Sequence, residues 1–358
     1  MRVKVSELQE GCILQKDVTG MTVYPLVPKK TVLNPIHLDV LKRFSIDSVE
    51  VERTLVDGTL FKPQTTVEDT EDQKIEAIPL SFTESYLKAI SEFKQEFTKW
   101  QSGGAVDFMK VRSIIMPLLK KVIESPENLH TIRHYSNPKD YLYHHSVAVG
   151  LISGMLAKKL GYDVGVYNQA ALGGMLSDCG MARTRASILE KKSLSQWEFQ
   201  EIREHTLNSY KMVKDSPLLK PEIKLAIYQH HERLDGTGYP GGEKADKIHM
   251  MSRIIAVADV YHAMTSERAY RSKQSPFKVL EMITEDSFGQ FDISVVKALL
   301  SIIGDLSIGT KVRLSNGEEG SVIFTKREAL TRPLVKLEKS EEIIDLVQNR
   351  NIFIEDVI

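Results

Sequence analysis

The sequence has few of the features that mark secreted, membrane or redox proteins. It has two cysteines in 358 residues, Cys12 and Cys179, and neither belongs to a CxxC pair of the kind that binds zinc or forms a redox dithiol. No run of about 18 apolar residues is present, and the N-terminus has no continuous apolar segment, so we expect neither a membrane span nor an export signal. These absences predict a cytoplasmic protein in a reducing compartment.

The chain also has almost no net charge. Lysine and arginine number 47 and aspartate and glutamate number 48, so no overall field attracts it to nucleic acid or to an anionic membrane. We therefore expect no DNA or RNA partner, and any phosphate recognition must be local. With 42% apolar and 27% charged residues the composition is that of an ordinary globular protein, and the length favours two or three domains.

The hydrophobic pattern predicts a mainly α-helical protein in four parts. Short β-rich runs around a helical pattern predict a small α/β module, a polar stretch followed by two helices predicts a connection, continuous helical periodicity predicts an all-α domain, and alternating runs predict a small β-rich appendage. The expected boundaries of these four parts are 1–62, 63–130, 131–305 and 306–358.

Local signals refine this division. In the connecting part, the helix expected over 108–124 contains Pro117, which should kink or split it. In the last part, Asn316-Gly317 between two alternating runs is typical of a β-hairpin turn. The helices expected in the all-α part are 140–160, 164–176, 196–213, 221–231, 250–266, 276–286 and 293–303.

The most unusual stretch runs from His230 to Gly242. Two adjacent histidines precede a turn rich in glycine and proline, Gly238-Tyr239-Pro240-Gly241-Gly242. Tandem histidines are common metal ligands, and such a turn can bring backbone amides and an aromatic ring against a ligand. A polar surface loop after a helix is the structural alternative.

Histidines are concentrated in the helical part, where nine of the ten fall between His130 and His262. Helical spacing puts His145 and Asp259 on apolar packing faces, whereas the face of His205 is ambiguous. A buried carboxylate is costly without a cation. Each residue alone could be a satisfied core group, but one or two per successive helix is the pattern of a metal site in a bundle. The candidate ligands are His145, Asp178, His205, His230, His231 and Asp259.

This mixture of imidazoles and carboxylates suits iron or manganese, and also zinc, cobalt or nickel, better than calcium. Asp178 could bridge two ions. A pair roughly 3.5 to 4 Å apart would stabilise both the attacking and the leaving oxygen of a displacement at phosphorus. The pattern therefore favours phosphodiester hydrolysis.

Three longer runs, His230–Pro240, Arg253–Asp259 and Met264–Arg271, give the part from about 131 to 305 a specific resemblance. It resembles the HD-GYP family of HD phosphohydrolases, which cleave cyclic di-GMP. The resemblance implies an HD-type helical bundle, two divalent ions held by the six candidate ligands, and Asp178 holding the nucleophilic water. The substrate-binding residues that it implies are Gly238, Tyr239, Pro240, Arg268 and Arg271.

The sequence departs from the family at four positions. Ser177 replaces the histidine of the family's His-Asp pair, and Met181 replaces its lysine. Tyr141 stands where three-metal members have a glutamate, so we expect at most two ions. His262 stands where an aspartate is usual, and we consider it a possible compensating ligand for the imidazole lost at Ser177. The alternative is a histidine that packs or bonds elsewhere.

Three functions remain open on these grounds. The first is a metal-dependent cyclic di-GMP phosphodiesterase, weakened by the changes at Ser177 and Met181. The second is a catalytically weak or inactive module that binds the nucleotide or a signalling partner such as a diguanylate cyclase, and that could form a homodimer. The third is an HD-type nucleotidase, which the intact Gly-Tyr-Pro loop disfavours.

Overall fold

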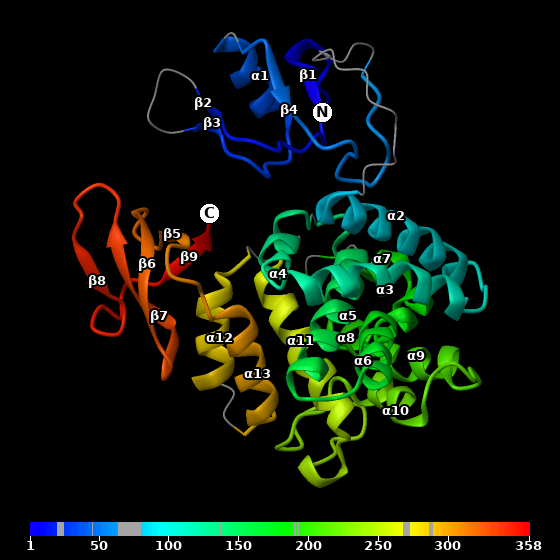
Figure 1. The fold of residues 1–358 in the computed structure, drawn as a ribbon. Helices are drawn as coiled ribbons and strands as arrows, with labels where there is room; N and C mark the ends of the chain where they lie inside the picture. Colours follow the sequence, from blue (N-terminus) through cyan, green and yellow to red (C-terminus); the bar gives the residue numbers. More distant parts are fainter. Residues whose placement is uncertain are drawn as a thin grey trace. The chain divides into compact units, whose positions relative to one another are not determined.

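The structure is a computed structural model that describes residues 1–19, 25–44, 46–63, 80–136, 138–189, 191, 193–267, 273–285 and 289–358. The chain folds as two compact units, Met1–Gln95 and Glu96–Ile358. Most of the described residues of the second unit are helical up to Ile303, and a small sheet follows (Figure 1). The prediction of a mainly α protein with a small N-terminal α/β module and a small C-terminal β appendage is confirmed.

The described residues of the N-terminal unit that precede α2 form two short antiparallel strand pairs and the helix α1. Strand β1 (Arg2–Lys4) pairs with β4 (Ser48–Glu50), and β2 (Val18–Thr19) pairs with β3 (Pro25–Val27). Helix α1 (Pro35–Arg43) begins after Asn34, whose side chain accepts a hydrogen bond from the His37 backbone amide, and Pro35 suits its first position. Aliphatic side chains from the strands and α1 share one small core.

The second unit contains the helical domain. Helix α2 (Phe82–Gln101) leads into it from the first unit. The helices that follow are α3 (Phe108–Glu124), α4 (Asn128–Thr131), α5 (Tyr141–Lys159), α6 (Val164–Leu176), α7 (Ala186–Leu189), α8 (Gln196–Arg203), α9 (His205–Val213), α10 (Pro221–Gln229), α11 (Met250–Thr265), α12 (Pro276–Glu285) and α13 (Ile293–Ile303).

Helices α5 and α6 form the centre of this domain and pack unusually closely. A Cβ atom added to Gly150 would lie 2.8 Å from the carbonyl oxygen of Ala171, and one added to Gly174 would lie 2.8 Å from that of Val149. Both approaches are too short for any residue but glycine, so the two backbones come together here. This contact holds the middle of α5 against the C-terminal half of α6.

Two helices differ from their predictions. Of the kink or split expected at Pro117, the split does not occur: helix α3 continues through the proline, because buried apolar side chains on both sides anchor it. The helix expected over 196–213 is two helices, interrupted at Glu204. The imidazole Nδ1 of His205 lies 2.6 Å from the Ile202 carbonyl oxygen. In a continuous helix this oxygen would accept a backbone hydrogen bond, so the imidazole competes with the helix for it. His205 therefore begins a new helix.

The C-terminal sheet packs against the helical domain through α12 (Figure 1). Its order is β8 (Ile343–Asp345), β7 (Ala329–Leu337), β6 (Glu319–Lys326), β5 (Lys311–Leu314), β9 (Ile354–Val357). The hairpin predicted at Asn316-Gly317 is confirmed, since β5 and β6 pair antiparallel across it. Phe277 of α12 is completely buried in the same core as the sheet, so this appendage completes its core with a helix of the neighbouring domain.

Within the described ranges, no helix combines the length and the apolar character that crossing a membrane would require.

Candidate metal centre

The six predicted ligands meet at one place in the helical domain. His145 is on α5, Asp178 lies between α6 and the 3-10 helix η3 (Cys179–Arg183), and Asp259 is on α11; His205 starts α9, and His230 and His231 follow α10. Their nitrogen and oxygen atoms form two groups in which each atom lies within 4.8 Å of the others. One group is Asp178, His205, His230 and His231, and the other is His145, Asp178 and Asp259. Asp178 belongs to both.

The carboxylate of Asp178 is at the centre of the arrangement. Its Oδ1 lies 3.2 Å from His205 Nε2 and 3.4 Å from His230 Nε2, and its Oδ2 lies 3.5 Å from His145 Nε2. The Oδ1 atom is buried, yet it has no hydrogen-bond partner among the described residues. Burial disfavours the charged carboxylate, but His205 and His230 outweigh this effect and hold the pKa of Asp178 well below its usual value. A charged, buried and unsatisfied oxygen is suited to a cation.

The backbone determines which nitrogen His205 and His230 present to Asp178. Nδ1 of His205 lies 2.6 Å from the Ile202 carbonyl oxygen, and Nδ1 of His230 lies 2.7 Å from that of Ile227. Since a carbonyl oxygen only accepts, each Nδ1 carries a hydrogen and donates it, so in the neutral form of each ring the lone pair is on Nε2. The two Nε2 atoms face each other at 3.2 Å. This is the tautomer that a metal-binding histidine requires.

The second group combines one imidazole, that of His145, with the carboxylates of Asp178 and Asp259. His145 Nε2 lies 2.9 Å from Asp259 Oδ1, and His231 Nδ1 lies 3.6 Å from Asp259 Oδ2. Burial opposes ionisation of Asp259, but the nearby imidazoles of His231 and His145 hold its pKa below the usual value. Burial and the neighbouring His230 lower the pKa of His231, so its ring is neutral, as a ligand must be. The donor atoms therefore fit divalent cations.

The loop after His231 folds back onto the centre because of Gly238. A Cβ atom at this position would lie 2.4 Å from the backbone nitrogen of Arg233 and from the His231 carbonyl oxygen, so only glycine fits. The buried Glu232 carboxylate accepts hydrogen bonds from the amides of Gly241 and Glu243, at 2.7 and 3.0 Å. As a result, the Tyr239 ring stacks on His231 with 4.7 Å between centroids. Pro240 is exposed.

The chain is similar to several known proteins. The HD domain family profile matches residues 131–295. The chain is 31% identical over 242 residues to a cyclic di-GMP phosphodiesterase of Pseudomonas aeruginosa, covering 67% of this chain and 58% of that one. It is 33% identical over 162 residues to 3'3'-cGAMP-specific phosphodiesterase 1 of Vibrio cholerae, covering 45% and 37%. The chain thus spans only part of the length of these relatives.

A solved structure has the same fold. It is the HDG"Y"P protein Bd1817 of Bdellovibrio bacteriovorus, which aligns with a TM-score of 0.51 at 14% sequence identity over 85% of this chain and 99% of that one. The helical domain belongs to the HD-GYP family.

The side of the HD-GYP domain formed by Ser177 to Arg183 contains two of the residues at which the sequence is expected to depart from the family pattern. The Ser177 hydroxyl donates to the Gly174 carbonyl at 2.8 Å, so it is bonded to its own helix. Met181 contacts the Thr184 hydroxyl through its sulfur at 3.9 Å and carries no charge. Burial raises the pKa of the Cys179 thiol to about 12, so this cysteine is not a thiolate ligand.

The backbone of the same segment nevertheless fits closely against α9. A Cβ atom on Gly180 would lie 2.3 Å from the His205 carbonyl oxygen, so this approach also requires glycine. The Ser209 hydroxyl accepts a hydrogen bond from the Gly180 amide at 2.7 Å and donates one to the Ser177 carbonyl at 2.6 Å. These contacts hold Asp178 beside His205.

Two residues that departed from the family pattern lie next to His145 on the side away from the carboxylates. The His262 Nδ1 lies 3.0 Å from His145 Nδ1, and the Tyr141 hydroxyl lies 3.1 Å from the same atom. His262 is in neither group of possible metal ligands. His262 lies three residues after Asp259 on α11, and its ring faces the Nδ1 edge of His145.

Arg203 is a residue of this site that the sequence reasoning missed. Its guanidinium lies 4.8 Å from the Tyr239 ring centroid and 4.9 Å from that of Phe199, and its Nε is buried without a hydrogen-bond partner in the described parts of the chain. The only sequence signal was a cation two residues before a candidate ligand. The two predicted substrate arginines, Arg268 and Arg271, lie outside the described residues.

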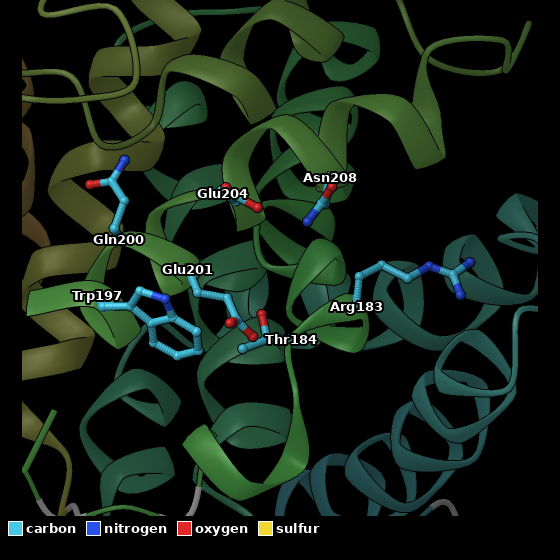
Figure 2. Close-up of a pocket in the computed structure, with 7 residues that line it drawn as sticks. All are labelled: Arg183, Thr184, Trp197, Gln200, Glu201, Glu204 and Asn208. Carbon is cyan, nitrogen blue, oxygen red and sulfur yellow. The ribbon is translucent and has the colours of Figure 1, made fainter. Parts of the chain in front are cut away.

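A separate hollow of about 330 Å³ lies on the surface beside η3, α8 and α9 (Figure 2). Trp197, Glu201 and Thr184 line one part of it, and Arg183 and Asn208 lie at the other (Figure 2). None of the six candidate ligands lines this hollow. It is distinct from the metal centre, and we assign it no function.

Proposed function

We propose that this chain hydrolyses a phosphodiester bond of a cyclic dinucleotide, with cyclic di-GMP as the substrate, at a centre of two divalent metal ions. The observation that carries the proposal is the position of Asp178, whose carboxylate belongs to both groups of imidazole and carboxylate ligands and has a buried Oδ1 without a hydrogen-bond partner among the described residues. A carboxylate shared in this way is the arrangement expected for a bridging ligand.

The ligand sets of the proposed ions follow from the two groups. His145, Asp178 and Asp259 would hold one ion, and Asp178, His205, His230 and His231 would hold the other. When bound, such ions supply a Lewis acid for phosphoryl oxygens and lower the pKa of water. Nitrogen and oxygen donors without thiolate favour iron(II) or manganese(II).

The chain's own residues would orient the substrate at this centre. Burial, and then the charges of Asp259 and Asp178, raise the pKa of the Tyr239 phenol, so the phenol stays neutral and can donate a hydrogen bond. The Arg203 guanidinium against its ring is placed to meet a phosphate or a guanine edge. Gly238 and Pro240 would shape the same loop, and Arg268 and Arg271 remain predicted substrate contacts.

A binding module with little or no catalysis is the second candidate, and the observation that favours it is the side formed by Ser177 and Met181. Neither side chain supplies an imidazole or a positive charge. Losing one transition-state donor costs about 2.7 to 4 kcal/mol, or about 100- to 1,000-fold in rate. Such losses weaken catalysis much more than recognition of the nucleotide.

The decisive experiment measures metal content, binding and cleavage on one preparation. The full chain is purified without added metal, and its bound ions are counted. It is then reconstituted anaerobically with iron(II) or manganese(II) and incubated separately with cyclic di-GMP and 3'3'-cGAMP, the latter because one relative bears that name. We expect two ions, and linear dinucleotide or GMP from cyclic di-GMP.

The other outcomes separate the alternatives. Tight binding of cyclic di-GMP without any product would contradict the phosphodiesterase proposal and support the binding module. Faster cleavage of 3'3'-cGAMP than of cyclic di-GMP would correct the proposed substrate but support the proposed reaction. Failure to bind either nucleotide in the presence of metal would overturn both candidates.

The relatives' names support a cyclic dinucleotide as the ligand of this chain. A cytoplasmic location, a homodimer and a diguanylate cyclase partner remain predictions from the sequence. Co-purification and sedimentation of the full chain would test the last two.

A further inference from the structure

His262 is a buried histidine that the proposed reaction does not use directly. Only 1% of its surface is exposed, and its ring lies 5.1 Å from the His145 ring between centroids. The two Nδ1 atoms are 3.0 Å apart. On the other edge of His145, Nε2 faces Asp259 Oδ1 at 2.9 Å and Asp178 Oδ2 at 3.5 Å. His145 therefore lies between the two carboxylates and His262.

His145 differs in this respect from the other ligands whose orientation is clear. His205 and His230 donate Nδ1–H to backbone carbonyls, which can only accept. Nδ1 of His145 instead faces two side-chain groups, the His262 ring and the Tyr141 hydroxyl, and each of these can donate or accept. The tautomer of His145 is therefore decided by side chains.

The hydrogen positions follow from the requirement that Nε2 of His145 binds the ion. Its Nδ1 must then carry the hydrogen, because a neutral imidazole has only one N–H. Two Nδ1 atoms in contact share one hydrogen, so Nδ1 of His262 accepts and Nε2 of His262 carries its own N–H. That Nε2 lies 3.1 Å from the buried Ser266 hydroxyl, which can accept. The chain of contacts is consistent from Ser266 to the metal centre.

We propose that His262 is a positioning residue that accepts the Nδ1–H of His145 and thereby holds His145 as an Nε2 ligand in the group with Asp178 and Asp259. This proposal rests on the proposed two-ion centre, but it does not depend on what the centre cleaves. Orienting partners of metal-binding histidines change metal affinity by about 10- to 100-fold. The effect should fall on one ion, since His205 and His230 are oriented by the backbone.

The test is a titration of the metal-free full chain with manganese(II), with free manganese counted by electron paramagnetic resonance. We expect two equivalents in the wild type. His262→Phe keeps a ring of similar size and removes the acceptor, so one equivalent should remain tight while the dissociation constant of the other rises about 10- to 100-fold. His262→Asp restores an acceptor and should restore the second equivalent.

Matched variants separate positioning from general damage. His249→Asn changes another histidine next to α11, at its N-cap, where asparagine also caps, and should leave both equivalents unchanged. Circular dichroism checks that each variant is folded. Should His262→Phe not fold, Ser266→Ala is the milder variant, and the second equivalent should weaken in the same direction by a smaller factor.

Several results would overturn the proposal. They are two tight equivalents in folded His262→Phe, an equal loss of both ions in that variant, and a wild type that never binds a second equivalent. A wild type with two ions and the expected single loss in His262→Phe, but no cleavage of either nucleotide, would instead support the proposal while overturning the proposed function.

Discussion

Two sides of the metal centre contrast in what their sequence preserves. The loop side, residues 230–242, supplies two candidate ligands, an aromatic ring and a backbone turn held by Glu232. The helix side, residues 177–183, supplies Asp178 but presents Ser177 and Met181, where the family resemblance implies an imidazole and a lysine. Both sides are packed with equal closeness, through Gly238 and Gly180. Close packing of the backbone and chemical competence of the side chains are therefore separate properties.

The largest expected effect comes from the residue on which both sides depend. Asp178→Asn keeps the shape of the side chain and removes its charge, and we expect both ions to be lost, with affinities reduced by more than about 100-fold. Metal analysis after gel filtration measures this. Asp163→Asn, at the N-cap of α6, is the matched control. A variant that keeps two ions would show that Asp178 is not shared between them.

The contrast between the two sides is sharpened by restoring the missing groups. Ser177→His combined with Met181→Lys should raise cleavage of cyclic di-GMP by about 100- to 1,000-fold, because a positive charge returns beside the phosphate. The turnover number at saturating substrate measures the gain. Ser177→Ala with Met181→Leu controls for packing. If the restored variant binds two ions without any increase in rate, the weakness of the site lies elsewhere.

A smaller effect is expected on the loop side from Arg203. Arg203→Met keeps the apolar stem and removes the guanidinium that lies against Tyr239, so the KM for cyclic di-GMP should rise about 10-fold, the value of one charged hydrogen bond. Metal content should not change. Arg185→Met is the control, since Arg185 pairs with Glu201 and lies against Trp197. An equal effect in both variants would argue against a contact with the substrate.

The smallest expected effect is the dependence of metal affinity on pH. Burial lowers the pKa of the His205 imidazole, but Asp178 outweighs it and the pKa is raised. In the metal-free protein His205 therefore keeps its proton to a higher pH than a free imidazole, and the ion must displace that proton. Metal affinity should fall as the pH falls, by at most about tenfold per unit for each proton displaced.

Calorimetry in two buffers of different ionisation enthalpy counts the released protons. Binding of the ions without proton release at neutral pH would contradict the prediction.

Much of the helical domain could be predicted because its helices are long and periodic. The bounds expected for α6 and α13 agree with the structure, and those of α5, α10 and α11 differ by one or two residues. Amphipathic spacing also indicated that His145 and Asp259 point inward, and both are buried. The break at Glu204 was not predictable in this way, because it depends on one imidazole competing for a carbonyl.

The candidate site was predictable as a set of residue types and not as a geometry. Sequence spacing could not place Arg203 against Tyr239, since the two meet only when the loop after His231 folds back. Sequence spacing also could not decide whether His262 lies at the Nε2 edge of His145, beside the carboxylates, or at its Nδ1 edge. A helix position three residues from Asp259 allows both. The Phe277 contact that completes the core of the C-terminal sheet also joins segments distant in sequence.

The sequence by itself determined the helical class of the domain and the six candidate ligands, and its family resemblance implied that Ser177 and Met181 stand in place of an imidazole and a lysine. Periodicity and residue type carry this information along the chain. Only the tertiary structure decided that Asp178 joins two groups of ligands, that backbone carbonyls orient His205 and His230, and that His262 lies behind His145. These features depend on where helices cross, and the crossings are set by close approaches such as those at Gly150, Gly174 and Gly180.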